Sequence, residues 1–333
     1  VWALSLSGAP AWSQLSNGAG GPSPRTGYTV VRDAKRDRLV LFGSTTEDDL
    51  WQFDLTSQTW RRLNPGTVPN VTAYDHTCTR APSLDAALLF GPLSPAGIPE
   101  NAVLRYPLDG LHGFSILPTT GAAPAARSKH AAAFDPVRNR LLVFGGDARN
   151  GTQTATLPDV HALSLGGPFA WSTLPLSGGP GGRSKPLMQY DAAGDRLLVF
   201  GGTSTDGQNH VDLWELPLSG SPVWHLLDAG AGLPAMWGSE YAALVLDGPR
   251  HRLVLLGTPL DSIQVTAWTF DLNAAPHWER LATAGTPPDA LAGYGVEMDE
   301  YGSSILVLGG ESATSLESFV DARMALSHKG PAT

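Results

Sequence analysis

The chain contains a single cysteine, Cys78, so no disulfide can form within it. Charged residues are also scarce, at 16% of the 333 residues, and the formal net charge is −9. Because an acidic chain without a Lys/Arg cluster repels nucleic acid, we expect no nucleic-acid partner. No segment approaches the roughly 20 apolar residues that a membrane helix needs, so we also expect no membrane span.

Glycine and proline, in contrast, are abundant, with 38 and 27 residues. They show no collagen-like period and stand between short apolar runs, as turn residues do in proteins built from many short strands. Composition therefore favours an all-β protein.

One apolar run that ends in Gly or Gly-Gly recurs six times, at a spacing of roughly fifty residues. Its copies cover residues 38–43, 87–91, 140–146, 196–202, 252–257 and 305–310. A second apolar segment precedes most copies. An alternating strand and then a strand opened by Trp follow them, with Phe114 in place of Trp in the second unit. The pattern thus predicts four strands in each unit, and we name them a to d from the axis outward.

Strands a and b are almost wholly apolar and are expected to be covered on both faces, whereas strand c alternates as a half-buried strand does. A single four-stranded sheet of this kind leaves apolar faces uncovered, so the units must stack and close into a ring. The glycine after strand b allows a sharp turn with positive φ. Six strand-b endings therefore predict six blades.

The b-strand ending in Gly-Gly, the aromatic residue of strand c and the Trp of strand d closely resemble the kelch repeat family. The segments 1–8 and 134–146 resemble, more narrowly, kelch domains of exported bacterial proteins. The resemblance covers essentially the whole chain and implies a six-bladed kelch-type β-propeller, all-β, with four antiparallel strands per blade. It also implies a secreted, periplasmic or cell-surface location.

We expect one propeller domain over residues 1–333, closed by residues 1–15. The expected blades cover about residues 25–63, 73–117, 127–174, 183–227, 239–281, and 291–326 together with 1–15. Strand d of the last blade must come from the N-terminus, because no Trp follows Leu326. Strand c of that blade has two candidates, residues 1–6 and 319–326, and the sequence does not decide between them.

The resemblance also implies a ligand surface on one face of the disc. We call this the front face; it is formed by the loops that lead into strand a and those that join strands b and c. The residues expected there are Arg25, Tyr28, His76, Arg127, Lys129, His130, Asp147, Arg149, Arg183, Lys185, Asp206, Trp237, Glu240 and Tyr294.

Two interpretations of these residues remain open. Arg25, Arg127 and Arg183 suit a carboxylate-bearing or sugar-like ligand, because Arg forks bind carboxylates in bidentate fashion. Each of these arginines is followed by Ser or Thr just before strand a, and we call this pair the leader. Because the leader recurs in three blades, it can instead be a structural part of the repeat that connects loops of neighbouring blades. His76 and His130 hold equivalent positions on adjacent blades and, with Asp75 or Asp147, suit one transition metal. The alternative is that each His bonds a neighbouring loop.

We therefore expect a monomeric, non-catalytic recognition module that binds a protein, peptide or glycan. The alternative is a lyase, isomerase or oxidase, with or without a metal, whose site lies in the central funnel. No zinc-protease, nucleophile-elbow or phosphate-loop motif occurs in the sequence. Copper oxidases among kelch propellers need a Tyr cross-linked to Cys, and Cys78 does not obviously meet a Tyr from another blade.

Overall fold

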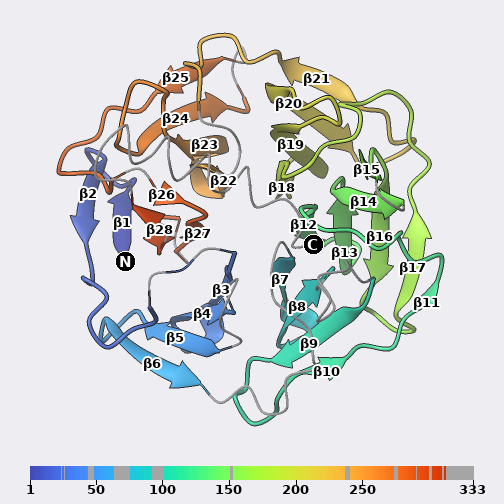
Figure 1. Cartoon of the computed structure of the whole chain (residues 1–333), viewed down its shortest axis with the longest axis horizontal. Coiled ribbons are helices and arrows are strands. Elements are labelled where there is room, and N and C mark those ends of the chain that lie inside the picture. The colour runs from blue at the N-terminus through green and yellow to red at the C-terminus, as the bar shows by residue number, and fades with distance from the viewer. Residues whose placement is uncertain are drawn as a thin grey trace.

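The computed structural model describes residues 1–23, 25, 27–43, 49–63, 76–91, 101–150, 153–236, 241–273, 277–289, 291–299, 302–309 and 311–312. Within these residues six antiparallel sheets surround a central axis (Figure 1). No helix in the described part of the chain is long and apolar enough to cross a membrane. The all-β, six-bladed prediction is confirmed.

Each blade contains four strands in the order a, b, c, d. Blade 1 contains β3 (Thr29–Asp33), β4 (Arg38–Phe42), β5 (Leu50–Asp54) and β6 (Thr59–Leu63). Blade 2 contains β7 (Thr77–Ala81), β8 (Ala86–Phe90), β9 (Val103–Pro107) and β10 (Ser115–Ile116). Blade 3 contains β12 (Ala131–Asp135), β13 (Arg140–Phe144), β16 (Val160–Ser164) and β17 (Ala170–Thr173), with β11 (Thr120–Gly121) added parallel to β17.

Blade 4 contains β18 (Leu187–Asp191), β19 (Arg196–Thr203), β20 (Asn209–Pro217) and β21 (His225–Asp228). Blade 5 contains β22 (Ala242–Asp247), β23 (Arg252–Gly257), β24 (Thr266–Asp271) and β25 (Trp278–Arg280). Blade 6 contains β27 (Gly295–Met298), β28 (Ser304–Leu308), β1 (Trp2–Ser5) and β2 (Ala11–Gln14). Two short pairs, β14 (Asp147–Asn150) with β15 (Gln153–Thr156) and β26 (Leu291–Ala292) with β29 (Glu311–Ser312), lie outside the blades.

The N-terminus closes the ring by supplying two strands of the last blade. Strand β1 pairs with β28 in the register Leu4↔Ile305, and β2 pairs with β1. In Figure 1 the blue β1 and β2 accordingly stand beside the red β28 and β27. The predicted origin of strand d is confirmed, and strand c also comes from the N-terminus. The closure joins residues 2–5 to residues 304–307 by main-chain hydrogen bonds, so β28 has no open edge.

Apolar clusters fill the spaces between consecutive blades. In blades 3, 4 and 5, the Trp that opens strand d packs on the Phe that ends strand b of the preceding blade. Ring centroids are 5.2 Å apart for Phe90 and Trp171, and 5.5 Å apart for Phe144 and Trp224. In blade 2, Phe114 replaces Trp and packs against Phe42 at 6.1 Å. The aromatic pairs therefore fix the spacing of neighbouring sheets.

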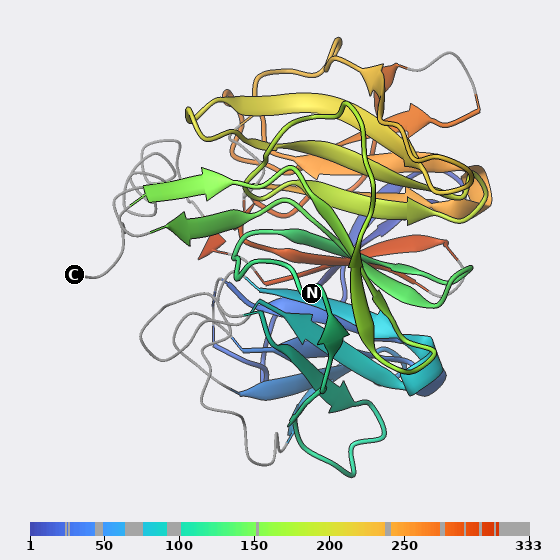
Figure 2. The same ribbon diagram turned by 90° about the vertical axis from the view of Figure 1, so that its right-hand side faces the viewer.

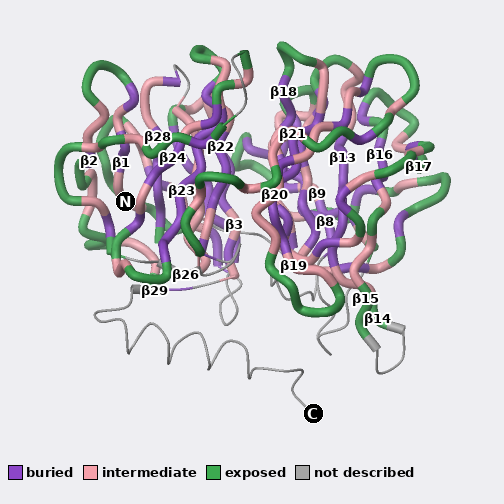
Figure 3. The backbone as a smooth tube through the Cα atoms, turned by 90° about the horizontal axis from the view of Figure 1, so that it is seen from above, coloured by how far each residue is buried: buried purple, intermediate pink, exposed green. Residues whose placement is uncertain are grey.

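The back face, formed by the turns that join strands a and b, carries polar ties between neighbouring blades. Arg36 pairs with Asp85 at 2.8 Å between blades 1 and 2, and Arg138 pairs with Asp195 at 2.6 Å between blades 3 and 4. His251 approaches Asp191 to 3.2 Å between blades 5 and 4. These contacts connect the turns of neighbouring blades and so stabilise the ring at its back face. The front face carries the pairs β14–β15 and β26–β29, which project from the disc (Figures 2 and 3).

Candidate functional site

Arg127 precedes strand a of blade 3, and its side chain is buried inside that blade. The guanidinium group donates to both oxygens of Asp159, at 2.6 and 3.0 Å, and to the carbonyl oxygen of Gly145 at 3.0 Å. Burial alone would raise the pKa of Asp159, but hydrogen bonds from His161 and Arg127 hold that pKa well below its usual value. The bidentate fork is thus occupied by an acid of the same blade.

The same arrangement recurs in the other two blades that carry the leader. Arg25 pairs with Asp49 in blade 1, and Arg183 pairs with Asp212 at 2.8 Å in blade 4. Two residues after each acid, a ring nitrogen bonds the same carboxylate. The three rings belong to Trp51 at 2.6 Å, His161 at 2.8 Å and Trp214 at 2.7 Å.

In blades 2 and 5 both the leader arginine and the acid are absent. By register with strand b, the position of Asp159 is taken by Ala102 in blade 2 and by Thr266 in blade 5. The corresponding leader positions hold Ala73 and Ser239. This matched occurrence supports the structural interpretation of Arg25, Arg127 and Arg183. Sequence analysis did not identify the acid partners Asp49, Asp159 and Asp212. Each begins a three-residue pattern, Asp-Leu-Trp or Asp-Val-His, that would have indicated it.

His76 and His130 each reach back to the preceding blade. Nε2 of His76 lies 3.1 Å from Oγ1 of Thr29, and Nε2 of His130 lies 2.8 Å from Oγ1 of Thr77. Burial lowers the pKa of His76 to about 4 and that of His130 to about 3. Both rings are therefore neutral at physiological pH and connect blades, although their partners Thr29 and Thr77 begin strands β3 and β7 and do not lie in loops.

The metal site stays a prediction. Nδ1 of both imidazoles is buried and has no hydrogen-bond partner in the described part of the chain. Asp147, one of the two carboxylates considered as a third ligand, instead accepts from Ser184 at 3.0 Å. The other, Asp75, lies outside the described residues. Among the residues described, no group of three or more His, Cys, Asp or Glu side chains could hold a metal ion.

Tyr28 and Tyr294 occupy the position of the two histidines in blades 1 and 6. The Tyr28 hydroxyl donates to the carbonyl oxygen of Leu308 and accepts from the Gly295 amide at 2.8 Å. The Tyr294 hydroxyl lies 3.1 Å from the carbonyl oxygen of Leu256, in blade 5. These residues also join each blade to the one before it.

Lys129 and Lys185 adopt the left-handed backbone conformation at the front face, with φ of 55° and 51°. The equivalent residues of blades 1 and 6 are glycines, Gly27 and Gly293, with φ of 69° and 64°. The two lysines are neighbours, because the amide of Lys185 donates to the carbonyl oxygen of Lys129 at 2.7 Å. A lysine in this conformation costs about 1 kcal/mol or more relative to glycine.

Asp147 and Arg149 lie on the β14–β15 hairpin beside these lysines. One carboxylate oxygen of Asp147 lies 3.5 Å from Nζ of Lys129. Arg149 is exposed, and neither it nor Lys185 forms an ion pair within the described residues. The front face of blades 3 and 4 thus offers three cationic side chains, and the carboxylate of Asp147 partly neutralises Lys129. Asp206, also exposed, caps its own loop by accepting from the Gln208 amide at 3.2 Å.

Two further predicted site residues, Trp237 and Glu240, lie outside the described residues. A residue that sequence analysis did not single out is Glu297, on the innermost strand of blade 6. Burial raises its pKa to about 8, against smaller opposing effects of Arg32 and Arg80. Its carboxyl group meets the backbone of Arg32, on the innermost strand of blade 1. No repeat pattern marks it, since the equivalent residue of blade 1 is Val31.

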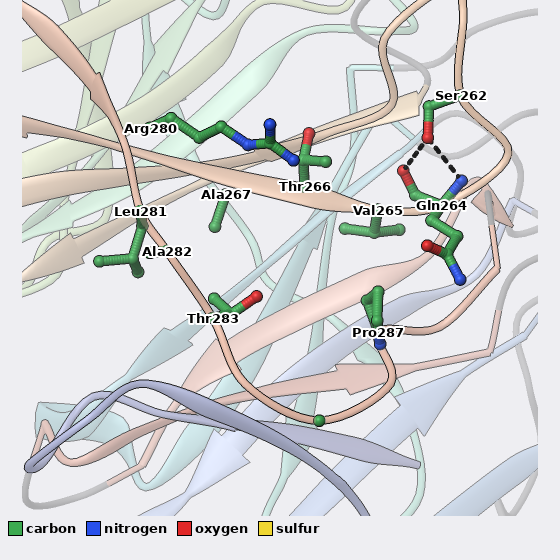
Figure 4. A pocket seen from close by; sticks show the side chains of 11 residues that line it. Ser262, Gln264, Val265, Thr266, Ala267, Arg280, Leu281, Ala282, Thr283 and Pro287 are labelled. Carbon is green, nitrogen blue, oxygen red and sulfur yellow. Dashed lines mark hydrogen bonds between the residues drawn. The ribbon is translucent and has the colours of Figure 1, made fainter.

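A cavity of about 470 Å³ lies at the outer edge of blade 5, beside blade 6. Its walls include Gln264, Thr266, Arg280 and Thr283, with Ala267 among the apolar contributors (Figure 4). None of these residues was among the predicted ligand-binding positions.

Comparison with known proteins identifies the repeat. The KLHDC2/KLHL20/DRC7 Kelch-repeats domain family matches residues 75–310. The solved structure of YjhT is similar with a TM-score of 0.67 at 14% identity, covering 88% of this chain and 92% of YjhT, which shows the shared fold.

Among curated proteins, multiple epidermal growth factor-like domains protein 8 of Mus musculus is 28% identical over 64% of this chain. Putative adagio-like protein 2 of Oryza sativa subsp. japonica is 27% identical over 74%, and Kelch domain-containing protein 2 of Bos taurus is 37% identical over 38%. The matches span 8%, 40% and 29% of those relatives. All three are eukaryotic, so the resemblance to exported bacterial proteins stays a prediction.

Proposed function

Since the chain belongs to the kelch-repeat family, whose propellers typically mediate protein interactions, we propose that it recognises an acidic protein or peptide segment on the front face of blades 3 and 4. The observation that carries this proposal is the pair Lys129 and Lys185 in left-handed backbone conformation. Backbone strain of this kind clusters at ligand clamps, where the side chain is needed.

In the described part of the chain, the side chains of the two lysines make one ion pair, between Lys129 and Asp147 at 3.5 Å, and neither side chain pairs across a blade-to-blade sheet contact. Gly27 and Gly293 adopt the same conformation in blades 1 and 6, so glycine serves the backbone there. In blades 3 and 4 the main chain still connects the two loops, through Lys185 N–H and Lys129 C=O. What lysine adds to this arrangement is its charge, which supports a role in binding.

The charge pattern favours an acidic partner. The protein carries a formal net charge of −9, so a local group formed by Lys129, Lys185 and Arg149 stands out from its surroundings. Asp147 offsets part of that charge at Lys129, while Lys185 and Arg149 have no carboxylate partner in the described part of the chain. Carboxylate side chains of a partner would be attracted to this group and oriented by it.

Selection of ligands from a random peptide library tests the proposal. The protein is immobilised, and the variant Lys129→Gly/Lys185→Gly serves for counter-selection. Glycine suits both positions, so this variant should fold at least as well as the parent protein. We expect recovered peptides to be rich in Asp and Glu and to bind the variant at least about tenfold more weakly, or roughly 1.4 kcal/mol.

Lys35→Ala provides a matched control, because Lys35 is an exposed lysine on the back face. It should leave binding unchanged. Peptides without acidic enrichment, or equal binding to the glycine variant, would contradict the proposed site. A glycan array probed in parallel tests the glycan ligand predicted from the sequence, and size-exclusion chromatography with light scattering tests the monomeric state.

A further inference from the structure

Asp147 places an acid inside the cationic group of the front face. Its Oδ2 atom lies 3.5 Å from Nζ of Lys129 and accepts a hydrogen bond from Oγ of Ser184 at 3.0 Å. Lys129 belongs to blade 3 and Ser184 to blade 4, so the carboxylate is held where the two blades meet. A cation and a hydroxyl group thus bind the Asp147 carboxylate as they would bind a carboxylate of a ligand.

The backbone at this position does not require an acid. In blade 3, Asp147 exchanges two main-chain hydrogen bonds with Ser128, at 2.8 and 3.0 Å. In blade 4, Thr203 exchanges the same two hydrogen bonds with Ser184, both at 2.8 Å. Threonine therefore serves the main chain equally well, and what Asp147 adds to this arrangement is its negative charge.

The hairpin β14–β15 brings Arg149 to the same side as Asp147. The two residues are two positions apart on β14, so their side chains lie on one face of the hairpin, which projects from the disc (Figure 3). Thr156 lies opposite Asp147 and shares that face, and its hydroxyl oxygen is 2.8 Å from that of Thr205 in blade 4. Because Asp147 and Thr156 both contact blade 4, the face that carries Arg149 is turned towards blade 4, where Lys185 lies.

The three cations of this group therefore differ in what they offer a ligand. Lys129 has the Asp147 carboxylate within ion-pair distance. Lys185 and Arg149 form no ion pair with any residue that the structure describes. An incoming carboxylate is thus attracted by Lys185 and Arg149, whereas at Lys129 it must compete with Asp147.

We propose that Asp147 is an autoinhibitory residue, whose carboxylate occupies the place at Lys129 and Ser184 that a carboxylate of the acidic partner would take. This role rests on the proposed function of the front face and names the residue that limits affinity there. The partner binds through Lys185 and Arg149, and it reaches Lys129 by displacing Asp147. Displacement is feasible because the Lys129–Asp147 pair is partly exposed, and exposed ion pairs are weak.

Fluorescence polarisation with a labelled hexaglutamate peptide tests this role. Asp147→Asn removes the charge and keeps an oxygen that accepts from Ser184, and Asp147→Thr supplies the residue that blade 4 has at this position. We expect both variants to bind the peptide about three- to fivefold more tightly than the parent protein, since Lys129 becomes available to the ligand. Their affinities should also fall more steeply with salt concentration, because one more ion pair forms.

Glu279→Gln is the charge-matched control, because Glu279 is an exposed acid on strand d of blade 5. It changes the net charge by the same amount and should leave the affinity unchanged, since a charge at the outer edge of another blade is screened. Ser184→Ala is the second control. It removes the hydrogen bond to Asp147 and keeps the carboxylate, so it should not tighten binding.

The autoinhibitory role is overturned, and the proposed function is left intact, if the parent protein binds hexaglutamate and neither Asp147→Asn nor Asp147→Thr binds it more tightly. Equal tightening in Glu279→Gln would also overturn it, because the change in net charge would then explain the gain. If neither the parent protein nor the two Asp147 variants bind hexaglutamate, the proposed function itself is contradicted, and the autoinhibitory role with it.

Discussion

The hydroxyl group of Tyr28 donates a hydrogen bond to the carbonyl oxygen of Leu308, which lies 280 residues further along the chain. The contact joins blade 1 to blade 6, where the two ends of the repeat array meet. This contact leaves no room for a side chain at position 309, because a Cβ atom added to Gly309 would lie 2.6 Å from the Tyr28 hydroxyl oxygen. The Tyr28 hydroxyl group therefore stabilises the closure of the ring through its hydrogen bonds to blade 6.

Tyr28→Phe should lower the free energy of unfolding by about 1–3 kcal/mol, because it leaves the buried Leu308 carbonyl and Gly295 amide without their hydroxyl partner. Thermal denaturation followed by circular dichroism measures this loss. An unchanged unfolding midpoint would show that the closure does not depend on these hydrogen bonds.

Deletion of residues 1–15 should destabilise the fold severely. It removes β1 and β2, which provide strands c and d of blade 6, and it exposes the outer edge of β28 to solvent. Such an edge also favours aggregation. The midpoint of thermal unfolding is the measurement, and a truncated protein that melts with the full chain would contradict the observed closure.

Arg127→Ala should destabilise the protein by about 3–5 kcal/mol, since it leaves Asp159 half-buried with part of its charge uncompensated. Arg149→Ala provides the control on the same blade, because its exposed side chain forms no ion pair in the described part of the chain. It should change stability by about 0.5 kcal/mol or less. Equal effects of the two substitutions, measured by chemical denaturation, would argue against a structural role for the leader arginine.

Glu297 makes the stability of the ring depend on pH. Its pKa is about 8 in the folded protein against 4.5 as the ordinary value, so the folded state retains a proton that the unfolded chain has released. Stability is therefore fully present below about pH 4.5, falls as the pH rises towards 8, and is constant above that. Arg32 and Arg80 reduce the effect without reversing it.

Glu297→Gln removes this titration. We expect the parent protein to lose roughly 1–3 kcal/mol more than the variant between pH 5 and pH 9, since other groups titrate alike in both. Denaturant unfolding at the two pH values gives the comparison. Parallel stability curves for parent and variant would show that Glu297 is ionised in the folded state.

The architecture could be predicted because its signals are local and repeated. Six strand-b endings gave the number of blades, and the absence of Trp after Leu326 assigned strand d to the N-terminus. The source of strand c could not be predicted, because residues 1–6 and 319–326 both have strand-like patterns. Pairing of β1 with β28 decides it, and a main-chain register of that kind is not visible in composition.

The site was harder to predict because its contacts cross loops of unequal length. Asp159 follows the Gly145-Gly146 pair by more residues than Asp49 follows Gly43, so alignment on the glycines does not bring the acids into register. Equivalent positions on adjacent blades also left two interpretations of His76 and His130 open, because the sequence does not reveal where each ring points. In the structure each imidazole reaches a Thr of the preceding blade, Thr29 for His76 and Thr77 for His130.

The affinity of a selected acidic peptide for the parent protein and for Lys129→Gly/Lys185→Gly, measured over a range of salt concentrations, tests the central claim most directly. We predict at least about tenfold weaker binding by the variant at low salt and a flatter salt dependence, since the lost contacts are electrostatic. Equal affinities and equal salt dependences would contradict recognition through these two lysines.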